Sequence, residues 1–309
     1  MPASTASRKE YIARVNRVTD FIDNNIDGCL NLSVLSGIAH FSPFHFHRIF
    51  TLLQGETPHD YIRRIRLERA ASTLISDTDV QIFEVAVNCG FSGISVLSRQ
   101  FREHFGVSPT EFRTYWEENS KNSKTLSKDS KPDLKNLPDF WPEKPKTKRR
   151  SKMDTHVEVK EMPAMNLLYC RHIGEFELIG SAYEKLFRYA GPRGLLRFPD
   201  TKTVSVYHDD PNVTRIEKLR QSACITVDRD VKPDGEFGTL ELPAVVCAVG
   251  RFEIAETEFS AAWDEMCDWM TNSGYQPGEG LPYELYHNDH EQHPEKKFIL
   301  DICIPVKPL

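Results

Sequence analysis

Apolar residues in the first 116 positions recur three and four residues apart, which is the spacing of helices with one buried face. Hardly any stretch alternates apolar and polar residues as a half-buried strand would. One helical face consists of Tyr11, Val15, Val18, Ile22 and Ile26. A longer one, over residues 58–75, consists of Tyr61, Ile62, Ile65, Leu67, Ala70 and Leu74. This part of the chain is predicted to be all-α.

The helical part contains an internal repeat. Arg48-Ile49-Phe50 and Arg99-Gln100-Phe101 are 51 positions apart. At the same intervals they are followed by Gly55, Pro58 and Tyr61 in the first copy, and by Gly106, Pro109 and Phe112 in the second. Upstream, Leu35-Ser36 matches Val85-Ala86, and Phe41 matches Phe91, at an offset of 50. The turn of the second copy is therefore one residue longer.

Each copy reads as a short helix, a tight turn and a longer helix, which is a helix-turn-helix unit. The predicted helix pairs are 33–40 with 43–53, and 82–89 with 95–104. In the second turn Gly90 supplies a residue that adopts positive φ without strain. The second helix of such a unit enters the major groove of double-stranded DNA and presents three or four side chains to base edges.

Residues 153–309 mix β-like runs (204–207, 245–250 and 298–306) with single helices, and they also repeat. Glu161-Met162-Pro163-Ala164 matches Glu241-Leu242-Pro243-Ala244, and Val206-Tyr207-His208-Asp209-Asp210 matches Leu285-Tyr286-His287-Asn288-Asp289. Each copy is predicted as strand, helix, strand, strand, with helices at about 177–190 and 256–271. The fold class is thus an all-α tandem helix-turn-helix domain followed by an α+β domain of two similar halves, with a cleft between the halves.

The boundaries predicted from these patterns are 1–116 for the first domain, 117–152 for a basic polar linker and 153–309 for the second domain. The linker has too few apolar residues to bury a core, and residues 121–152 carry 11 basic and 4 acidic side chains. We interpret it as a solvated tether. Extra phosphate contact is the alternative, and Phe140 and Trp141 are candidates for docking on a neighbouring domain.

The overall charge of −6 is unevenly distributed. Residues 1–120 carry 12 basic and 14 acidic side chains, and residues 153–309 carry 16 and 27. The acidic second domain is repelled by nucleic acid, so DNA binding must rest on where the arginines of the first domain lie. No apolar run approaches the roughly 20 residues of a membrane helix, and residues 1–14 contain no signal-peptide core. Seven scattered cysteines fit free thiols in a reducing compartment, so we expect a cytoplasmic protein.

The helical part of the chain strongly resembles the AraC/XylS family of transcription activators, and its second helix-turn-helix unit carries the family's signature nearly whole. The resemblance covers about residues 10–115. It rests on Ile82-x-x-Val85-Ala86, Gly90-Phe91-Ser92, Ser95, Leu97-Ser98-Arg99-x-Phe101, Gly106-Val107-Ser108-Pro109 and Phe112-Arg113.

By that resemblance, the groove-facing residues are Pro43, Phe44, His47 and Arg48 in the first unit, and Gly93, Ile94, Ser95, Ser98 and Arg99 in the second. Arginine binds guanine bidentately or grips phosphate. Phe44 is interpreted either as a contact to a thymine methyl or as a core residue. Gly93, Ile94 and Ser95 offer few bidentate groups, so the second unit is expected to hold mainly the DNA backbone.

Two clusters of charged or titratable residues are interpreted as solvent-exposed. Arg63, Arg64, Arg66 and Arg69 on the long helix are expected to form a solvated face, with phosphate contact by one or two of them as the alternative. His287, His290 and His293, with Asp289, are expected to lie in a solvated loop, with a metal site as the alternative. We expect no metal, cofactor or catalytic residue.

Residues 154–307 resemble the GyrI-like effector-binding domain, so the whole chain resembles Rob-type regulators. The matched residues are the Pro-Ala strand openings, Gly250-Arg251-Phe252, Trp263 and Gly280-Leu281-Pro282-Tyr283-Glu284-Leu285-Tyr286. The family places a carboxylate at Glu284, in the cleft. Ser205 stands at the matched position of the first half, so this carboxylate breaks the symmetry as a ligand contact would. The alternative is a solvent-facing strand residue.

Glu284, Trp263, Tyr283 and Tyr286 are therefore the predicted ligand-binding residues, for a small aromatic or cationic effector. The predicted function is a sequence-specific DNA-binding transcription regulator that responds to this effector, with RNA polymerase as a further partner and no enzyme activity. The first alternative is a GyrI-like hydrolase of small electrophiles tethered to a DNA-binding domain. The second is a ligand-free interaction module.

Overall fold

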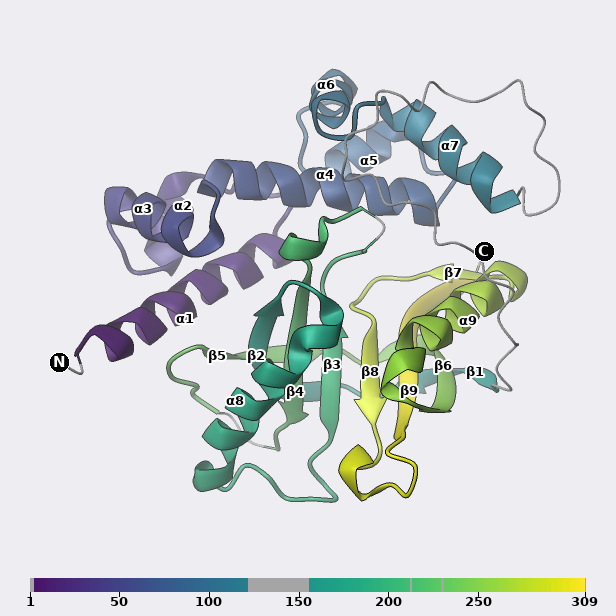
Figure 1. Ribbon diagram of the computed structural model, residues 1–309. Helices are drawn as coiled ribbons and strands as arrows, with labels where there is room; N and C mark the ends of the chain where they lie inside the picture. The colour runs from purple at the N-terminus through teal and green to yellow at the C-terminus, as the bar shows by residue number, and fades with distance from the viewer. Residues whose placement is uncertain (1–2, 122–155, 212, 229–230, 309) are drawn as a thin grey trace. The chain divides into compact units, whose positions relative to one another are not determined.

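A computed structural model describes residues 3–121, 156–211, 213–228 and 231–308 (Figure 1). The chain divides into two compact units, one helical and one built on a β-sheet. The last helix of the first unit continues to Lys121, five residues into the predicted linker. The rest of that linker, with Phe140 and Trp141, lies outside the described residues.

The helical unit carries the two predicted helix-turn-helix pairs, with a long helix, α4, between them (Figure 1). Its helices are α1 (Ala3–Asn24), α2 (Leu32–Ile38), α3 (Pro43–Gln54), α4 (Pro58–Ser76), α5 (Ile82–Asn88), α6 (Ile94–Phe105) and α7 (Pro109–Lys121). Local sequence sets the start of α3 and α4. Ser42 and Thr57 cap the first free amides, and a proline with pre-set φ follows each cap.

The two units of the repeat build equivalent cores, and α4 contributes to both. Residues 61–65 of α4 pack in the first core and residues 67–74 in the second. In each core a phenylalanine of the second helix meets an aromatic residue of the next helix edge-on. The ring centroids of Phe50 and Tyr61 are 5.3 Å apart at 86°, and those of Phe101 and Phe112 are 5.2 Å apart at 83°. The sequence repeat therefore corresponds to the same aromatic packing contact in both cores.

The turns follow the prediction as well. Gly90 has a φ of +73°, and His40 takes the equivalent place in the first turn with a φ of +52°. Four residues separate α2 from α3, and five separate α5 from α6. The one-residue difference between the turns is confirmed.

The expectation of a solvated arginine face on α4 is wrong for Arg64 and Arg66, which are partly buried, whereas Arg63 and Arg69 are exposed as expected. Arg64 lies between Glu56 and Glu68 with N–O distances of 2.9 Å to each, and all three side chains are largely buried. Arg66 donates to the backbone carbonyls of Ile26 and Gly28, and Arg69 donates to that of residue 23. Arg64 and Arg66 therefore contribute to the packing of the first unit.

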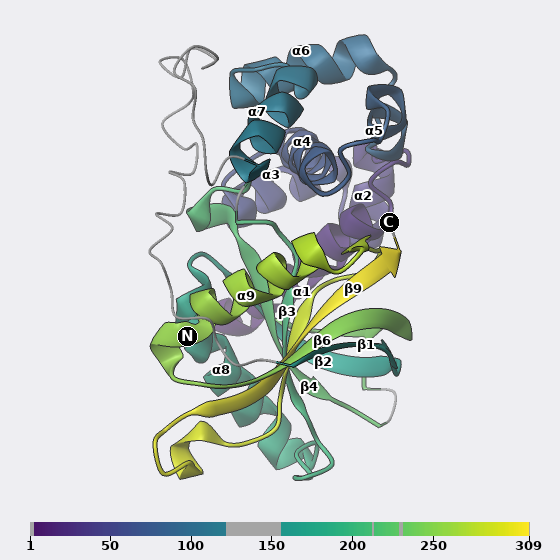
Figure 2. The same cartoon turned by 90° about the vertical axis from the view of Figure 1, so that its right-hand side faces the viewer.

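The second unit is an antiparallel sheet in the order β1-β6-β9-β8-β3-β4-β2-β5, with the short β7 paired to β9. Figure 2 shows its strands fanning out with a strong twist. The strands are β1 (Val157–Met162), β2 (Met165–Ile173), β3 (Thr203–Tyr207), β4 (Arg220–Thr226), β5 (Phe237–Leu242), β6 (Val245–Ile254), β7 (Tyr275–Pro277), β8 (Tyr283–Tyr286) and β9 (Phe298–Pro308). Helices α8 (Gly180–Ala190) and α9 (Phe259–Asn272) cover one face of the sheet (Figure 1).

The two halves are related by a local two-fold axis at the centre of the sheet. There β3 pairs with β8, and Ser205 lies opposite its repeat equivalent Glu284. Each half begins with one more strand than predicted, because Pro163 and Pro243 separate β1 from β2 and β5 from β6. These first strands are exchanged, since β1 pairs with β6 of the second half and β5 pairs with β2 of the first.

Candidate functional site

The second helix of the first helix-turn-helix unit presents the predicted groove residues to solvent. Pro43, Phe44, His47 and Arg48 of α3 are all exposed. Phe44 is 65% exposed, which excludes the core interpretation. The Arg48 guanidinium lies 5.6 Å from the centre of the Phe44 ring. This contact holds the arginine beside an apolar group on the face that would meet DNA.

The second unit presents a similar face on α6. Ile94, Ser95 and Arg99 are exposed, while Gly93 and Ser98 are half-buried. Helix α3 contains no acidic residue, and α6 contains one, Glu103. Few acidic side chains of these two helices would therefore repel phosphate, although the domain as a whole is slightly acidic.

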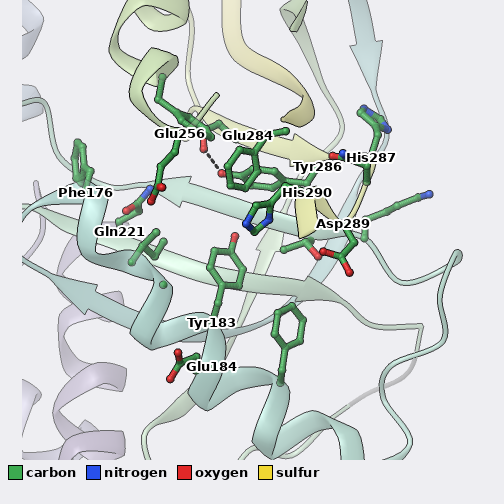
Figure 3. A pocket seen from close by; sticks show the side chains of 18 of the residues that line it. Phe176, Tyr183, Glu184, Gln221, Glu256, Glu284, Tyr286, His287, Asp289 and His290 are labelled. Carbon is green, nitrogen blue, oxygen red and sulfur yellow. Dashed lines mark hydrogen bonds between the residues drawn. The ribbon is translucent and has the colours of Figure 1, made fainter. Parts of the chain in front are cut away.

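In the second unit a cavity of about 940 Å³ opens between the helices and the centre of the sheet. Its walls come from both halves of the repeat, as predicted, and include β3, β4, β8, the start of α8 and the segment before α9 (Figure 3). Its aromatic lining residues are Phe176, Tyr183, Phe187, Phe198, Tyr207, Phe259, Tyr286 and Phe298. The volume suits a drug-sized molecule.

Glu284 lies at the floor of this cavity and is 1% exposed. Its Oε1 accepts hydrogen bonds from the Tyr207 hydroxyl and the Trp263 indole, both at 2.7 Å. Its Oε2 accepts one from the Tyr286 hydroxyl at 2.6 Å. Three donors thus fix the carboxylate, which excludes the interpretation of Glu284 as a solvent-facing strand residue.

The hydrogen-bond network follows the two-fold axis. Tyr183 on α8 is the counterpart of Trp263 on α9, and its hydroxyl bonds Ser205 at 2.9 Å as the indole bonds Glu284. The Tyr286 hydroxyl also lies 3.3 Å from the Ser205 hydroxyl, and the hydroxyl of its counterpart Tyr207 likewise bonds Glu284 across the axis. The two central residues thus have hydrogen-bond partners at equivalent positions, but one of them is a serine and the other a carboxylate.

Burial sets the proton affinities in this network. It raises the pKa of Glu284 above its ordinary value, and the bonds from Tyr286, Trp263 and Tyr207 oppose that shift. Burial, and then the nearby Glu284 carboxylate, raise the pKa of Tyr207 and Tyr286 well above the ordinary value. Both tyrosines therefore remain protonated donors at neutral pH.

The cavity as a whole is acidic. Five carboxylates line it, and Lys202 is the one lysine or arginine among the described lining residues. The carboxylates belong to Glu177, Glu184, Glu256, Glu284 and Asp289. An acidic, aromatic-lined cavity attracts cations by charge and by cation–π contact.

Comparison with known proteins supports both domains. Residues 35–115 match a family described as a helix-turn-helix domain, and residues 155–307 match the GyrI-like small molecule binding domain. The regulatory protein SoxS of Escherichia coli (strain K12) is 34% identical over 93 residues, which are 30% of this chain and 86% of SoxS. The chain belongs to the AraC family of transcription regulators. Its second domain is GyrI-like.

Two further proteins are similar to parts or most of the chain. The probable transcriptional regulator LumQ of Photobacterium leiognathi is 32% identical over 109 residues, and the match covers 35% of this chain and 44% of LumQ. The chain thus spans less than half the length of that relative. The cryo-electron microscopy structure of an EcmrR–DNA complex is 14% identical with a TM-score of 0.43, covering 90% of this chain and 99% of EcmrR.

The predicted ligand-binding residues of this AraC-family protein do not all reach the cavity. Glu284 and Tyr286 line it, and Trp263 supports Glu284 by its hydrogen bond. Tyr283 does not reach it, because successive strand residues point to opposite faces and Tyr283 packs in the core on the other side of the sheet. The prediction missed Tyr207, although the repeat pairs Tyr207 with Tyr286.

The histidines after β8 make separate contacts. His287 bonds Asp301 at 2.9 Å, His290 stacks on Phe298, and His293 approaches Glu253. Within the described ranges, no group of three or more metal-binding side chains is placed to hold an ion. No helix in the same ranges is both long and apolar enough to cross a bilayer.

Proposed function

We propose that this protein is a sequence-specific DNA-binding transcription regulator whose activity depends on a small aromatic cation bound in the GyrI-like domain. One observation carries the ligand part of the proposal. Glu284 is a buried carboxylate at the floor of an aromatic cavity, in the same chain as two helix-turn-helix units.

The physical case for a cation begins with the cost of burying a carboxylate. That cost is several kcal/mol unless the charge is paired, and the three bonds to Glu284 come from neutral groups. A cation in the cavity would supply the missing counter-charge. The ring faces around it would add cation–π attraction.

The DNA part of the proposal assigns base contact to α3 and mainly backbone contact to α6. Arg48 lies beside the exposed Phe44, which offers an apolar surface to a thymine methyl. On α6, Arg99 is the one long cation among the predicted groove residues. We extend the proposal to RNA polymerase as the partner through which a bound ligand changes transcription.

The hydrolase alternative receives less support from the geometry. Tyr207 and Tyr286 are held protonated, so neither supplies a phenolate. Three hydrogen bonds already occupy most of the lone-pair sites of Glu284, and the residue is 1% exposed. A general base needs a free lone pair within reach of water. These features favour a binding site.

The test uses the full-length protein. Binding sites are selected from a random duplex pool, and transcription from a promoter carrying the selected site is measured with and without rhodamine 6G, an aromatic cation. We expect one selected sequence and a change in transcription that Glu284→Gln abolishes. Failure to select any sequence contradicts the DNA-binding part, and a cation response equal in both proteins contradicts the ligand part. Release of products from the cation would support the hydrolase instead.

A further inference from the structure

We infer that Gln221 is a second specificity-determining residue of the cavity, which accepts a hydrogen bond from an N–H group of the ligand. By this inference, which rests on the proposed function, the cavity prefers cations that keep an N–H donor over cations whose nitrogens are fully alkylated.

Gln221 lies on β4 directly opposite Tyr207 on β3. Paired residues of neighbouring strands point to the same face, so Gln221 and Tyr207 both line the cavity. Figure 3 shows Gln221 in the same cavity as Glu284. The residue is 1% exposed, yet its Oε1 has no hydrogen-bond partner among the residues that the structure describes. A buried acceptor without a partner is costly, and native proteins rarely keep one without a use.

The two-fold axis shows that folding does not require an amide here. The pair Tyr207–Gln221 in the first half corresponds to the pair Tyr286–Leu300 in the second. Leu300 is fully buried among apolar residues beneath α9. The fold therefore accepts leucine at this position. Gln221 is more polar than its counterpart Leu300, just as Glu284 is more polar than its counterpart Ser205.

The positions of Gln221 and Glu284 also indicate the shape of the ligand. The two residues stand on β4 and β8, with β3 between them. Neighbouring strands are about 4.8 Å apart, so roughly 10 Å separates the two positions across the sheet. A flat aromatic cation with an amino group at one end can place its charge over Glu284 and Tyr286 and its N–H at Gln221.

The experiment compares two cationic xanthylium dyes by fluorescence polarisation with the full-length protein. Rhodamine 6G carries secondary amino groups with N–H donors, whereas the amino groups of tetramethylrhodamine ethyl ester are dimethylated. Gln221→Leu, the residue of the equivalent site, removes the acceptor, and Gln221→Met removes it while keeping an unbranched side chain. Thermal unfolding of each variant shows that it is folded.

We expect both variants to weaken binding of rhodamine 6G about fivefold, the value of one net hydrogen bond, and to leave binding of the dimethylated dye unchanged. Equal weakening for both dyes, or for neither, overturns the role of Gln221. Glu284→Gln separates the two proposals, because it should weaken both dyes. If wild-type protein binds neither dye, or if Glu284→Gln has no effect, the cation site itself is contradicted, and the inference about Gln221 falls with it.

Discussion

Replacing Glu284 with glutamine tests the origin of cation selectivity, because the change removes the charge while keeping the size of the side chain. The amide oxygen can still accept from Tyr207 and Trp263, and the Tyr286 hydroxyl can accept from the amide nitrogen. A cation about 5 Å from the carboxylate gains about 3 kcal/mol at an effective dielectric constant of about 20. Part of this gain offsets desolvation of the cation, so we expect Glu284→Gln to weaken binding at least about tenfold, or ~1.4 kcal/mol.

The assay is isothermal titration calorimetry of wild-type and variant protein with rhodamine 6G and an uncharged xanthene of the same ring system. The neutral compound should lose less than about threefold, because its binding depends on area and ring contacts. Glu184→Gln is the matched control. Glu184 also lines the cavity but is exposed, and an exposed charge contributes little. If cation and neutral compound lose affinity alike, or if Glu184→Gln has the same effect, Glu284 does not select for charge.

The same substitution removes a dependence on pH. Because burial raises the pKa of Glu284, wild-type protein should lose cation affinity as the pH falls through that raised pKa and recover it as the pH rises. The raised pKa also means that the folded state favours the protonated form. The resulting stabilisation is present below the ordinary pKa and is lost as the pH rises through the raised one. Glu284→Gln should therefore flatten both profiles and unfold at a higher temperature than wild type at neutral pH.

Three further predictions concern the helical domain. Arg48→Ala should weaken binding to a selected DNA site by about 1–3 kcal/mol in gel-shift titrations; equal loss on random DNA would reassign the arginine to phosphate contact. Arg64→Met removes the cation that two largely buried carboxylates share and should lower the free energy of urea unfolding by about 3–5 kcal/mol; the control Arg63→Met, at an exposed site, should change it by less than about 1 kcal/mol. Gly90→Ala forces a Cβ to 2.6 Å from a backbone carbonyl at positive φ and should cost at least about 1–2 kcal/mol, whereas Gly37→Ala, with nothing within 4 Å, should not destabilise; similar thermal midpoints for the two variants would contradict the strain.

Much of the helical domain can be predicted from sequence because its signals are local. Helical periodicity gives the buried faces, and the repeat at 51 positions carries the Phe–Tyr and Phe–Phe contacts of both cores. The α4 arginines show where local signals fail. The pair Arg64 and Glu68, four residues apart, can be recognised in the sequence. The sequence does not show that Glu56, which precedes the helix, also pairs with Arg64, or that all three side chains are largely buried. A charge run says nothing about which side chains fold back onto the protein.

In the second domain, the sequence revealed the two halves but not how they join. The exchange of β1 and β5 depends on pairing between distant segments, which no local pattern encodes. The error at Tyr283 was avoidable, since strand alternation separates it from Glu284. Tyr207 was accessible through its match to Tyr286. Gln221 carries no sequence signal beyond its polarity in a buried strand, and it stands out only once Leu300 is known to be its counterpart.

The central position of Glu284 has a consequence for any symmetric version of this site. Two identical subunits that met at such an axis would contribute the same residue twice, so the carboxylates there would number two or none. Two would repel each other and share a proton, and none would leave a cation without an anchor. A single chain with two diverged halves can carry different residues at the two equivalent positions, so Ser205 can remain neutral while Glu284 is charged. Covalent duplication thus permits an odd number of charges on an axis where subunit symmetry allows only even ones.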